Sequence, residues 1–223
     1  MDKNLFIQAL SKFFSGLLLM GILLFLPAGT FNYPQAWLLI CILFVPMFMA
    51  GSVMMAVNPE LLKKRLNAKE EQADQKTVIL LSALMFLVSF VLAGLSFRFG
   101  WLMLPKWVSY AGAALFLTGY VLFAEVLREN TYLSRTIEVQ EGQTVIDTGL
   151  YGIVRHPMYM CTLLMFLSMP LVLGSLPAFL VMPVYIPIIS KRIRNEEHVL
   201  EEGLVGYREY KQRVRWKVLP HIW

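Results

Sequence analysis

Long apolar segments recur along this chain, and they limit the folds that it can adopt. A helix needs about 20 mostly apolar residues to cross the hydrocarbon core of a bilayer. Four segments reach that length, and two shorter ones follow that are separated only by a Gly-Ser pair; in order they are Leu5–Leu26, Ala36–Val57, Thr77–Phe97, Trp107–Leu127, Pro157–Leu173 and Leu176–Ser190. Of the 223 residues, 57% are hydrophobic and only 16% are charged, whereas charged residues approach a quarter of an ordinary soluble domain. The sequence therefore predicts an all-α integral membrane protein with about six transmembrane helices, of which the last two form a short helical hairpin.

The positions of the basic residues predict the orientation in the membrane. With the N-terminus in the cytosol, every loop that carries lysine or arginine lies inside, except the loop with Arg98 and Lys106. This distribution follows the positive-inside rule, so we expect a multi-pass membrane protein with both termini in the cytosol. The net charge of +5 then reflects loops near anionic lipid, and the expected partner is the lipid bilayer, not a nucleic acid.

Polar residues are distributed unevenly along the chain. Residues 1–127 are predicted to form a scaffold of four membrane helices with a polar, helical connector at Asn58–Lys76 on the cytosolic side. Residues 128–223 contain a polar loop with β-branched residues (Asn130–Gly149), the hairpin, and a basic tail with several aromatic residues. We interpret the chain as a single membrane domain, 1–223, in which residues 128–223 carry the chemistry.

Arg155-His156-Pro157 is the first polar cluster, and it stands where the hairpin begins. Proline is favoured at the first position of a helix, and helix N-termini attract anions. Tyr159 follows within the first turn, and Tyr151 lies shortly before it. The alternative is an interfacial Arg-His pair that reaches toward lipid headgroups, which is common for a single arginine.

A second cluster follows the sixth apolar segment. Arg192 and Glu196 are four residues apart and share one helix face, whereas Glu197 is rotated by roughly 100° from Glu196. In isolation this pair is explained by a salt bridge on a solvated helix. Charged groups at a membrane boundary that can meet inside a bundle are, however, functional candidates.

The tail has a third pattern. Tyr207, Tyr210 and Val214 lie on one helical stripe with basic residues beside it. This pattern favours an amphipathic helix anchored at the membrane surface. Trp216 and Trp223 fit the aromatic belt of such an interface.

Several kinds of site are missing from the sequence. There is no G-x-G-x-x-G turn, no Walker motif and no G-x-S-x-G elbow, so Rossmann, P-loop and α/β-hydrolase sites are excluded. The three histidines have no metal-ligand spacing, and Cys41 and Cys161 lie in apolar segments, so no metal site is expected. What remains is a polar pocket built from a loop, the hairpin and the helix that follows it.

At these residues the chain resembles the isoprenylcysteine carboxyl methyltransferase family, in its broad prokaryotic branch related to phospholipid methyltransferases. The family pattern is an Asn-led loop, a G-x-Y-x-x-x-R-H-P-x-Y element, a hairpin, R-x-x-x-E-E, G-Y-x-x-Y and a C-terminal proline. The matching residues here are Asn130, Gly149-Leu150-Tyr151, Arg155-His156-Pro157-Met158-Tyr159, Arg192, Glu196-Glu197, Gly206-Tyr207, Tyr210 and Pro220. The combination is specific, although R-H-P-x-Y alone would be weak.

The resemblance implies a cytosolic C-terminal pocket for S-adenosyl-L-methionine. Because the branch is prokaryotic, it also implies a bacterial or archaeal cytoplasmic membrane. The implied cofactor contacts are Gln140, Gln143, Thr144, Val145, Ile146, Tyr151, His156, Pro157, Met158, Tyr159 and Glu196, and Arg192 is the implied catalytic residue facing the substrate. Gln143 stands where the family commonly has histidine, which weakens that contact. Cys161 stands where a glycine usually follows the tyrosine, and it could narrow the hairpin or shift its packing.

These implications predict an S-adenosylmethionine-dependent methyltransferase. The expected acceptor is membrane-embedded or lipophilic, with a carboxylate such as that of an isoprenylcysteine-like compound favoured. Alternatives are an NADPH-dependent membrane reductase of related architecture and a non-catalytic membrane scaffold.

Overall fold

The computed structural model describes residues 3–66, 73–134 and 137–223, and within these ranges the chain is helical with no strand. A single isolated bridge joins Met103 to Ser175. The elements in chain order are α1 (Lys3–Ala28), α2 (Pro34–Val57), α3 (Pro59–Leu66), α4 (Ala73–Phe99), α5 (Lys106–Glu129), η1 (Gly149–Gly152), α6 (Pro157–Val172), α7 (Leu176–Val181), η2 (Met182–Val184), α8 (Tyr185–Gly203) and α9 (Tyr207–Arg213).

Five helical stretches of the described chain are long and apolar enough to cross a membrane: α1, α2, Lys76–Phe99 of α4, α5, and the continuous run Leu176–Gly203. The sixth apolar helix, α6, has 16 residues and spans only about 24 Å at 1.5 Å per residue. The predicted all-helical integral membrane fold is confirmed. The second arm of the hairpin differs from the prediction, because its helix continues past Ser190 to Gly203.

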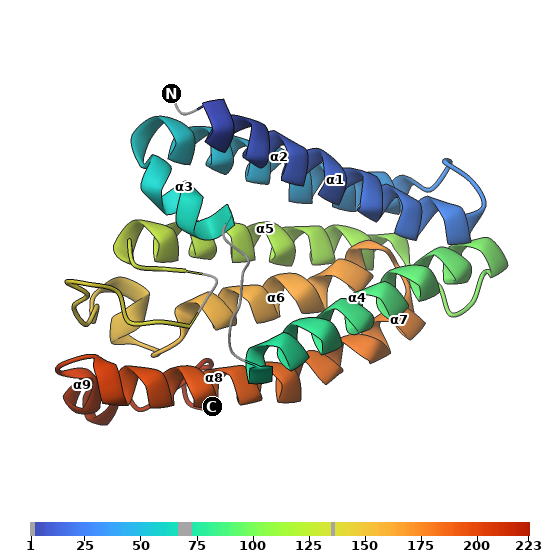
Figure 1. Cartoon of the computed structure of the whole chain (residues 1–223). Helices are drawn as coiled ribbons and strands as arrows, with labels where there is room; N and C mark the ends of the chain where they lie inside the picture. The colour runs from blue at the N-terminus through green and yellow to red at the C-terminus, as the bar shows by residue number, and fades with distance from the viewer. Residues whose placement is uncertain (1–2, 67–72, 135–136) are drawn as a thin grey trace.

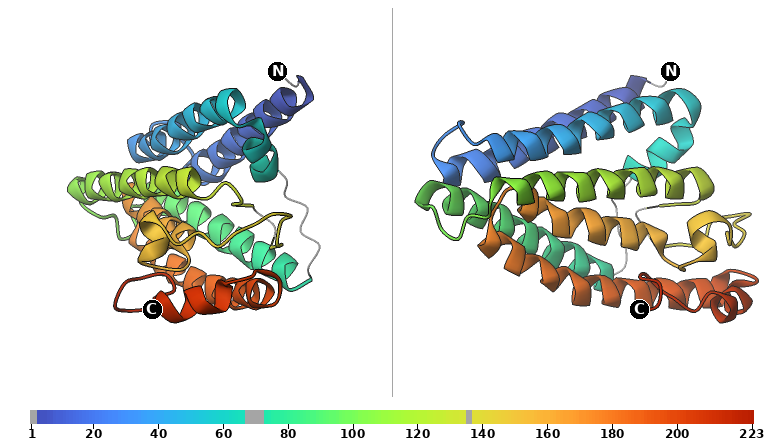
Figure 2. Two further views of the ribbon diagram at one scale, coloured as in Figure 1. Left: turned by 90° about the vertical axis from the view of Figure 1, so that its left-hand side faces the viewer. Right: turned by 180° about the vertical axis from the view of Figure 1, so that it is seen from behind.

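The helices form one bundle (Figures 1 and 2). In Figure 1, α1 and α2 form an upper layer, α5 and α6 lie side by side beneath it, and α8 runs along the bottom. The largest apolar core joins α1, α2, α4, α5, α6 and α7, with Leu24, Leu39, Ala93, Phe116 and Leu173 fully buried in it. Tyr33 stacks on Phe97 with ring centroids 4.0 Å apart, and its hydroxyl donates to the carbonyl of Leu173 over 2.8 Å. The hairpin is therefore packed into the scaffold.

Glycine allows α5 to approach α6 closely. A Cβ atom at Gly112 would lie 2.8 Å from Leu171 Cβ and 2.9 Å from the backbone nitrogen of Val172. A Cβ at Gly119 would lie 2.5 Å from Met165 Cγ. Small residues at membrane helix interfaces permit this backbone approach, and here they hold α6 against the scaffold.

We expect Gly112→Ala to lower the free energy of unfolding by about 1–3 kcal/mol, because the added methyl group would overlap the backbone of α6. Gly51→Ala in α2 is the matched control, since a Cβ there meets nothing within 4 Å, and alanine is the better helix former. Thermal unfolding in detergent measures both variants. Equal melting temperatures would contradict the proposed close packing.

Polar segments collect at one end of the bundle, on the left in Figure 1. There the C-terminal ends of α5 and α8 lie near η1 and α9. The predicted connector is partly helical as α3, and its remaining residues 67–72 lie outside the described residues. The cytosolic orientation of this end remains a prediction.

Candidate functional site

A pocket lies at the polar end of the bundle, between the loop after α5, the start of α6 and one face of α8. It contains about 100 Å³ of free volume. Its lining residues are Asn130, Tyr132, Leu133, Ser134, Ile137, Glu138, Gln143, Thr144, Val145, Ile146, Tyr151, Arg155, His156, Pro157, Met158, Tyr159, Arg192, Glu196, Leu200, Leu204, Tyr207 and Tyr210.

Two faces of α8 have different surroundings. Arg192, Glu196 and Leu200 follow at four-residue intervals and line the pocket. Ile193 and Glu197 follow at the same interval on the neighbouring stripe, and both are buried. Since residues four apart share a helix face, consecutive glutamates are directed to different environments.

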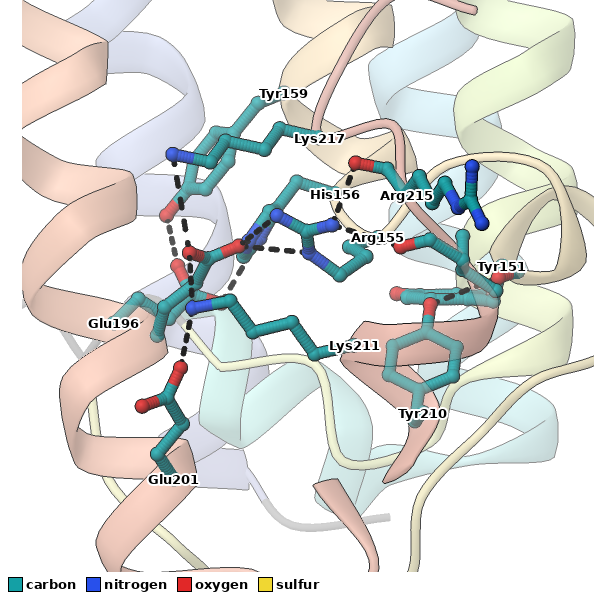
Figure 3. A network of polar contacts seen from close by, with 12 residues as sticks. Tyr151, Arg155, His156, Tyr159, Glu196, Glu201, Tyr210, Lys211, Arg215 and Lys217 are labelled. Carbon is teal, nitrogen blue, oxygen red and sulfur yellow. Dashed lines mark hydrogen bonds and ion pairs between the residues drawn. The ribbon is translucent and has the colours of Figure 1, made fainter. Parts of the chain in front are cut away.

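The buried glutamate pairs with Arg155. Both side chains are almost fully buried, with 4% and 6% exposure for Arg155 and Glu197 respectively. The Nε and Nη2 atoms of Arg155 both lie 2.8 Å from Glu197 Oε1 (Figure 3). Lys211 Nζ approaches the other carboxylate oxygen at 3.3 Å. This ion pair compensates two charges that would otherwise be buried alone.

Arg155 also fixes the segment after α9. Its Nη1 donates to the carbonyls of Val214 and Arg215 over 2.7 and 2.8 Å (Figure 3). The backbone N–H groups of Arg155 and His156 donate to the carbonyls of Trp216 and Lys217 over 2.9 and 2.8 Å. The segment after α9 is therefore bonded to the residues that precede α6.

His156 lies between the two glutamates. Its Nε2 is 3.2 Å from Glu197 Oε1, and its Nδ1 is 3.9 Å from Glu196 Oε1 (Figure 3). The side chain makes no capping hydrogen bond to the first turn of α6. His156 and Glu196 thus share one cavity, as the sequence interpretation requires.

A chain of polar contacts links α8 to α6 within the pocket. Arg192 Nε donates to the hydroxyl of Tyr159 over 2.9 Å, and this hydroxyl donates to the carboxylate of Glu196. Glu196 keeps 25% of its side chain exposed. Arg192 and Glu196 therefore both contact the hydroxyl of one tyrosine, and both line the pocket.

Buried tyrosines form another wall. The hydroxyl of Tyr151 accepts from Asn130 Nδ2 over 2.9 Å, and Tyr210 donates to the carbonyl of Tyr151 over 2.8 Å. Burial raises the pKa of both tyrosines above the ordinary value. Both hydroxyls therefore stay protonated; that of Tyr210 donates a hydrogen bond, and that of Tyr151 accepts one.

All but one of the predicted site residues line the pocket. Those lining the pocket are Gln143, Thr144, Val145, Ile146, Tyr151, His156, Pro157, Met158, Tyr159, Arg192 and Glu196. Gln140 is not among the lining residues: its side chain donates to the carbonyl of Tyr132 and accepts from Lys64 Nζ, each over 2.6 Å. In this structure Gln140 fastens the loop to α3. The roles of these residues in binding and catalysis remain predictions.

Cys161, which stands where the family usually has a glycine, is not among the residues that line the pocket. Cys161 is fully buried, and it packs in a cluster with Val126 of α5 and Tyr151 of η1. Its thiol therefore occupies space between the scaffold and the wall of the pocket.

The interpretation of Tyr207, Tyr210 and Val214 as a membrane anchor was wrong. All three are buried and pack together, with Val145, Leu200 and Leu204 around them. The apolar stripe of α9 therefore faces the protein, and two of its tyrosines line the pocket.

Sequence reasoning also missed the ion pair of Arg155 and Glu197. A signal was available, because Glu197 stands four residues after Ile193 and eight after Ile189. An acid on the apolar stripe of a helix requires a buried partner. Nothing local in the sequence identifies Arg155 as that partner, since 41 residues separate the two positions.

The chain is similar to known proteins in the region that forms the pocket. Residues 107–204 match the family model described as phospholipid methyltransferase. The Delta(14)-sterol reductase TM7SF2 of Mus musculus is 30% identical over 91 residues, which are 40% of this chain and 22% of that protein. The Delta(14)-sterol reductase of Methylotuvimicrobium alcaliphilum is 26% identical over 135 residues, which are 54% of this chain and 32% of that protein.

The chain therefore spans no more than about a third of these curated relatives. Among solved structures, the eukaryotic intramembrane Ras methyltransferase ICMT is similar with a TM-score of 0.48 and 15% identity, covering 98% of this chain and 85% of that one. The family match contains the start of α6, Arg192 and Glu196, and the resemblance noted in the sequence is thereby confirmed. The match to the phospholipid methyltransferase family model covers 98 of the 223 residues, and it includes the residues from three sides of the pocket.

Proposed function

We propose that the protein is an S-adenosylmethionine-dependent methyltransferase that acts on a lipophilic acceptor, favouring a carboxylate. The observation that carries the proposal is a single pocket lined by His156, Tyr159, Arg192 and Glu196, all within the region that matches the family. Each of these side chains comes from a short motif that the sequence interpretation singled out.

The chemical character of the lining fits S-adenosylmethionine. This cofactor has a carboxylate, an ammonium group, a ribose and an adenine, so it requires a cationic or N–H-rich end, an acid and aromatic or apolar walls. The start of α6 with His156 suits the carboxylate. Glu196 suits the ammonium or the ribose hydroxyls, and Tyr151 and Tyr159 supply aromatic surface.

The space available requires some side chains to move on binding. The free volume of about 100 Å³ is smaller than the 300–1,000 Å³ typical of small-molecule sites. Met158, Arg192 and Glu196 are only half-buried, so they can rearrange at low cost. The ion pair of Arg155 and Glu197 behind them is fully enclosed, and it is expected to keep its position.

The chain's own residues would act by positioning. The bound cofactor supplies a methyl group on a positively charged sulfur, which is open to direct displacement by a nucleophile. Such a transfer needs alignment of donor and acceptor and exclusion of water more than covalent help. Arg192 would orient an acceptor carboxylate through paired hydrogen bonds. A lipophilic acceptor would reach the pocket from the bilayer, since α6 and α8 extend from the membrane-spanning part of the bundle.

Transfer of a labelled methyl group tests the proposal. Membranes containing the protein, incubated with methyl-labelled S-adenosylmethionine, are expected to label a lipid-extractable product. Release of volatile label as methanol in base would identify a methyl ester, whereas base-stable label would identify N- or S-methylation. Membranes that contain the His156→Ala variant serve as the control. Absence of any label above that control would contradict the proposal.

The second candidate is an NADPH-dependent membrane reductase. One observation favours it: both curated relatives described above are named Delta(14)-sterol reductases. A dinucleotide carries several phosphate charges and requires a larger pocket with more cations. Among the lining residues, by contrast, the side chains with permanent positive charge are Arg155 and Arg192, and Arg155 is already paired with Glu197. This makes the methyltransferase the better-supported function.

A further inference from the structure

The hydroxyl of Tyr207, at the wall of the pocket, makes no hydrogen bond within the described part of the chain. The side chain of Tyr207 is only 4% exposed. The neighbouring Tyr210, on the same helix, donates its hydroxyl to the carbonyl of Tyr151. A buried polar group without a partner is costly and calls for an explanation.

The surroundings of Tyr207 restrict what could pair with it. Val145, Leu200 and Leu204 pack around the tyrosine cluster, so this side of the pocket is apolar. Burial and the negative charges of Glu197 and Glu196 raise the pKa of the Tyr207 hydroxyl above its ordinary value. The hydroxyl therefore stays protonated and offers a donor, and the same two carboxylates oppose an anionic acceptor.

We infer that Tyr207 is a cofactor-binding residue whose hydroxyl donates a hydrogen bond to an uncharged acceptor on the adenosine part of the methyl donor. This inference rests on the proposed function. A ring nitrogen of adenine satisfies both conditions, since it is neutral and belongs to a flat aromatic ring that suits Val145, Leu200 and Leu204. A ribose oxygen is also neutral, but it belongs to a more polar group. The carboxylate of the cofactor is assigned to His156, where the imidazole and the N–H groups at the start of α6 can compensate its charge. The apolar side chains around Tyr207 offer no such compensation.

The hydroxyl group can be removed alone by Tyr207→Phe. We expect the dissociation constant for S-adenosylhomocysteine to rise about 3- to 10-fold, the usual effect of one neutral hydrogen bond. The melting temperature of the ligand-free protein should stay equal or rise, because the variant removes a buried donor without a partner. A role limited to packing would instead leave affinity unchanged.

Tyr120→Phe is the matched control. Tyr120 lies on α5 outside the pocket lining, and its hydroxyl donates to the carbonyl of Leu43 over 2.8 Å. Loss of this bond should lower the melting temperature and leave the dissociation constant unchanged. The two variants thus show opposite patterns, although each removes one tyrosine hydroxyl.

Analogues of S-adenosylhomocysteine identify the acceptor. They carry a CH group in place of N1, N3 or N7, or lack one ribose hydroxyl. One analogue is expected to bind the wild-type protein more weakly than the parent compound does. Tyr207→Phe should bind that analogue and the parent compound equally well, because the variant and the analogue remove the same hydrogen bond.

The outcomes separate the two proposals. If the wild-type protein binds S-adenosylhomocysteine and Tyr207→Phe binds it equally well, the inference about Tyr207 is overturned while the proposed function stands. A drop in the melting temperature of Tyr207→Phe would likewise overturn it, by indicating that the hydroxyl has a partner within the chain. If the wild-type protein does not bind S-adenosylhomocysteine at all, the proposed function itself fails.

Discussion

Glu197→Ala is expected to lower the free energy of unfolding by about 3–5 kcal/mol, because it leaves the buried guanidinium of Arg155 without its counter-charge. The pair is 4% and 6% exposed and is joined by two contacts of 2.8 Å. Arg155 also bonds the carbonyls of Val214 and Arg215, so the variant should loosen the tail from the pocket. Thermal unfolding in detergent and protease sensitivity of the tail measure these two effects.

Glu202→Ala is the matched control for this prediction. Glu202 lies on the same helix, and its side chain is 65% exposed and pairs only loosely with His198 at 3.5 Å. Exposed pairs of this kind contribute little, so the expected change is below about 1 kcal/mol. The double variant Arg155→Met/Glu197→Leu should regain much of the lost stability, since it removes both charges. Similar melting temperatures for Glu197→Ala and Glu202→Ala would contradict the account of the ion pair.

Glu196→Gln is expected to act on binding while leaving stability nearly unchanged. Glu196 lines the pocket and keeps a quarter of its side chain exposed, so loss of its charge leaves no enclosed group unpaired. A charge-assisted hydrogen bond contributes about 1.5–3 kcal/mol, which corresponds to a dissociation constant for S-adenosylhomocysteine about 10- to 100-fold higher. Methyl transfer should fall at least as much.

The neighbouring glutamates therefore separate stability from binding. Glu197→Ala mainly lowers the melting temperature, whereas Glu196→Gln mainly lowers affinity. Titration of each variant at a temperature where it remains folded provides the comparison. If Glu196→Gln bound S-adenosylhomocysteine as tightly as the wild-type protein, Glu196 would have no part in cofactor binding.

The membrane helices could be predicted from the sequence because burial in lipid demands long apolar runs. The predicted bounds of the first four segments agree with α1, α2, α4 and α5 to within a few residues. The end of the hairpin could not be predicted in the same way. The helix continues through polar residues after Ser190 as far as Gly203. An apolar run does not mark this part, because one face of the helix lines the pocket and does not meet lipid.

The tail shows why an amphipathic pattern is ambiguous. A stripe of Tyr207, Tyr210 and Val214 can pack equally well against a membrane surface or against a protein. The choice depends on Val145, Leu200 and Leu204, which no periodicity in the tail can reveal. The backbone bonds from Arg155 and His156 to Trp216 and Lys217 likewise join segments that are distant in sequence.

The predicted set of pocket residues came from short motifs and from the family resemblance. His156 and Glu196 could be paired because both flank the hairpin, and hairpin arms bring their ends together. Gln140 could not be distinguished from its neighbours Gln143 and Thr144, since its direction depends on Lys64 in α3. Tyr207 was visible in the sequence as part of the tail stripe and of the G-Y-x-x-Y element, and neither pattern predicted that it lines the pocket.

Calorimetric titration of the purified wild-type protein in detergent shows whether the pocket binds the methyl donor or a dinucleotide. We expect saturable binding of S-adenosylhomocysteine that is lost in His156→Ala and strongly weakened in Glu196→Gln, with no binding of NADPH. Binding of NADPH in place of S-adenosylhomocysteine would contradict the account and support a reductase. Absence of binding by either compound would leave the pocket without a cofactor role.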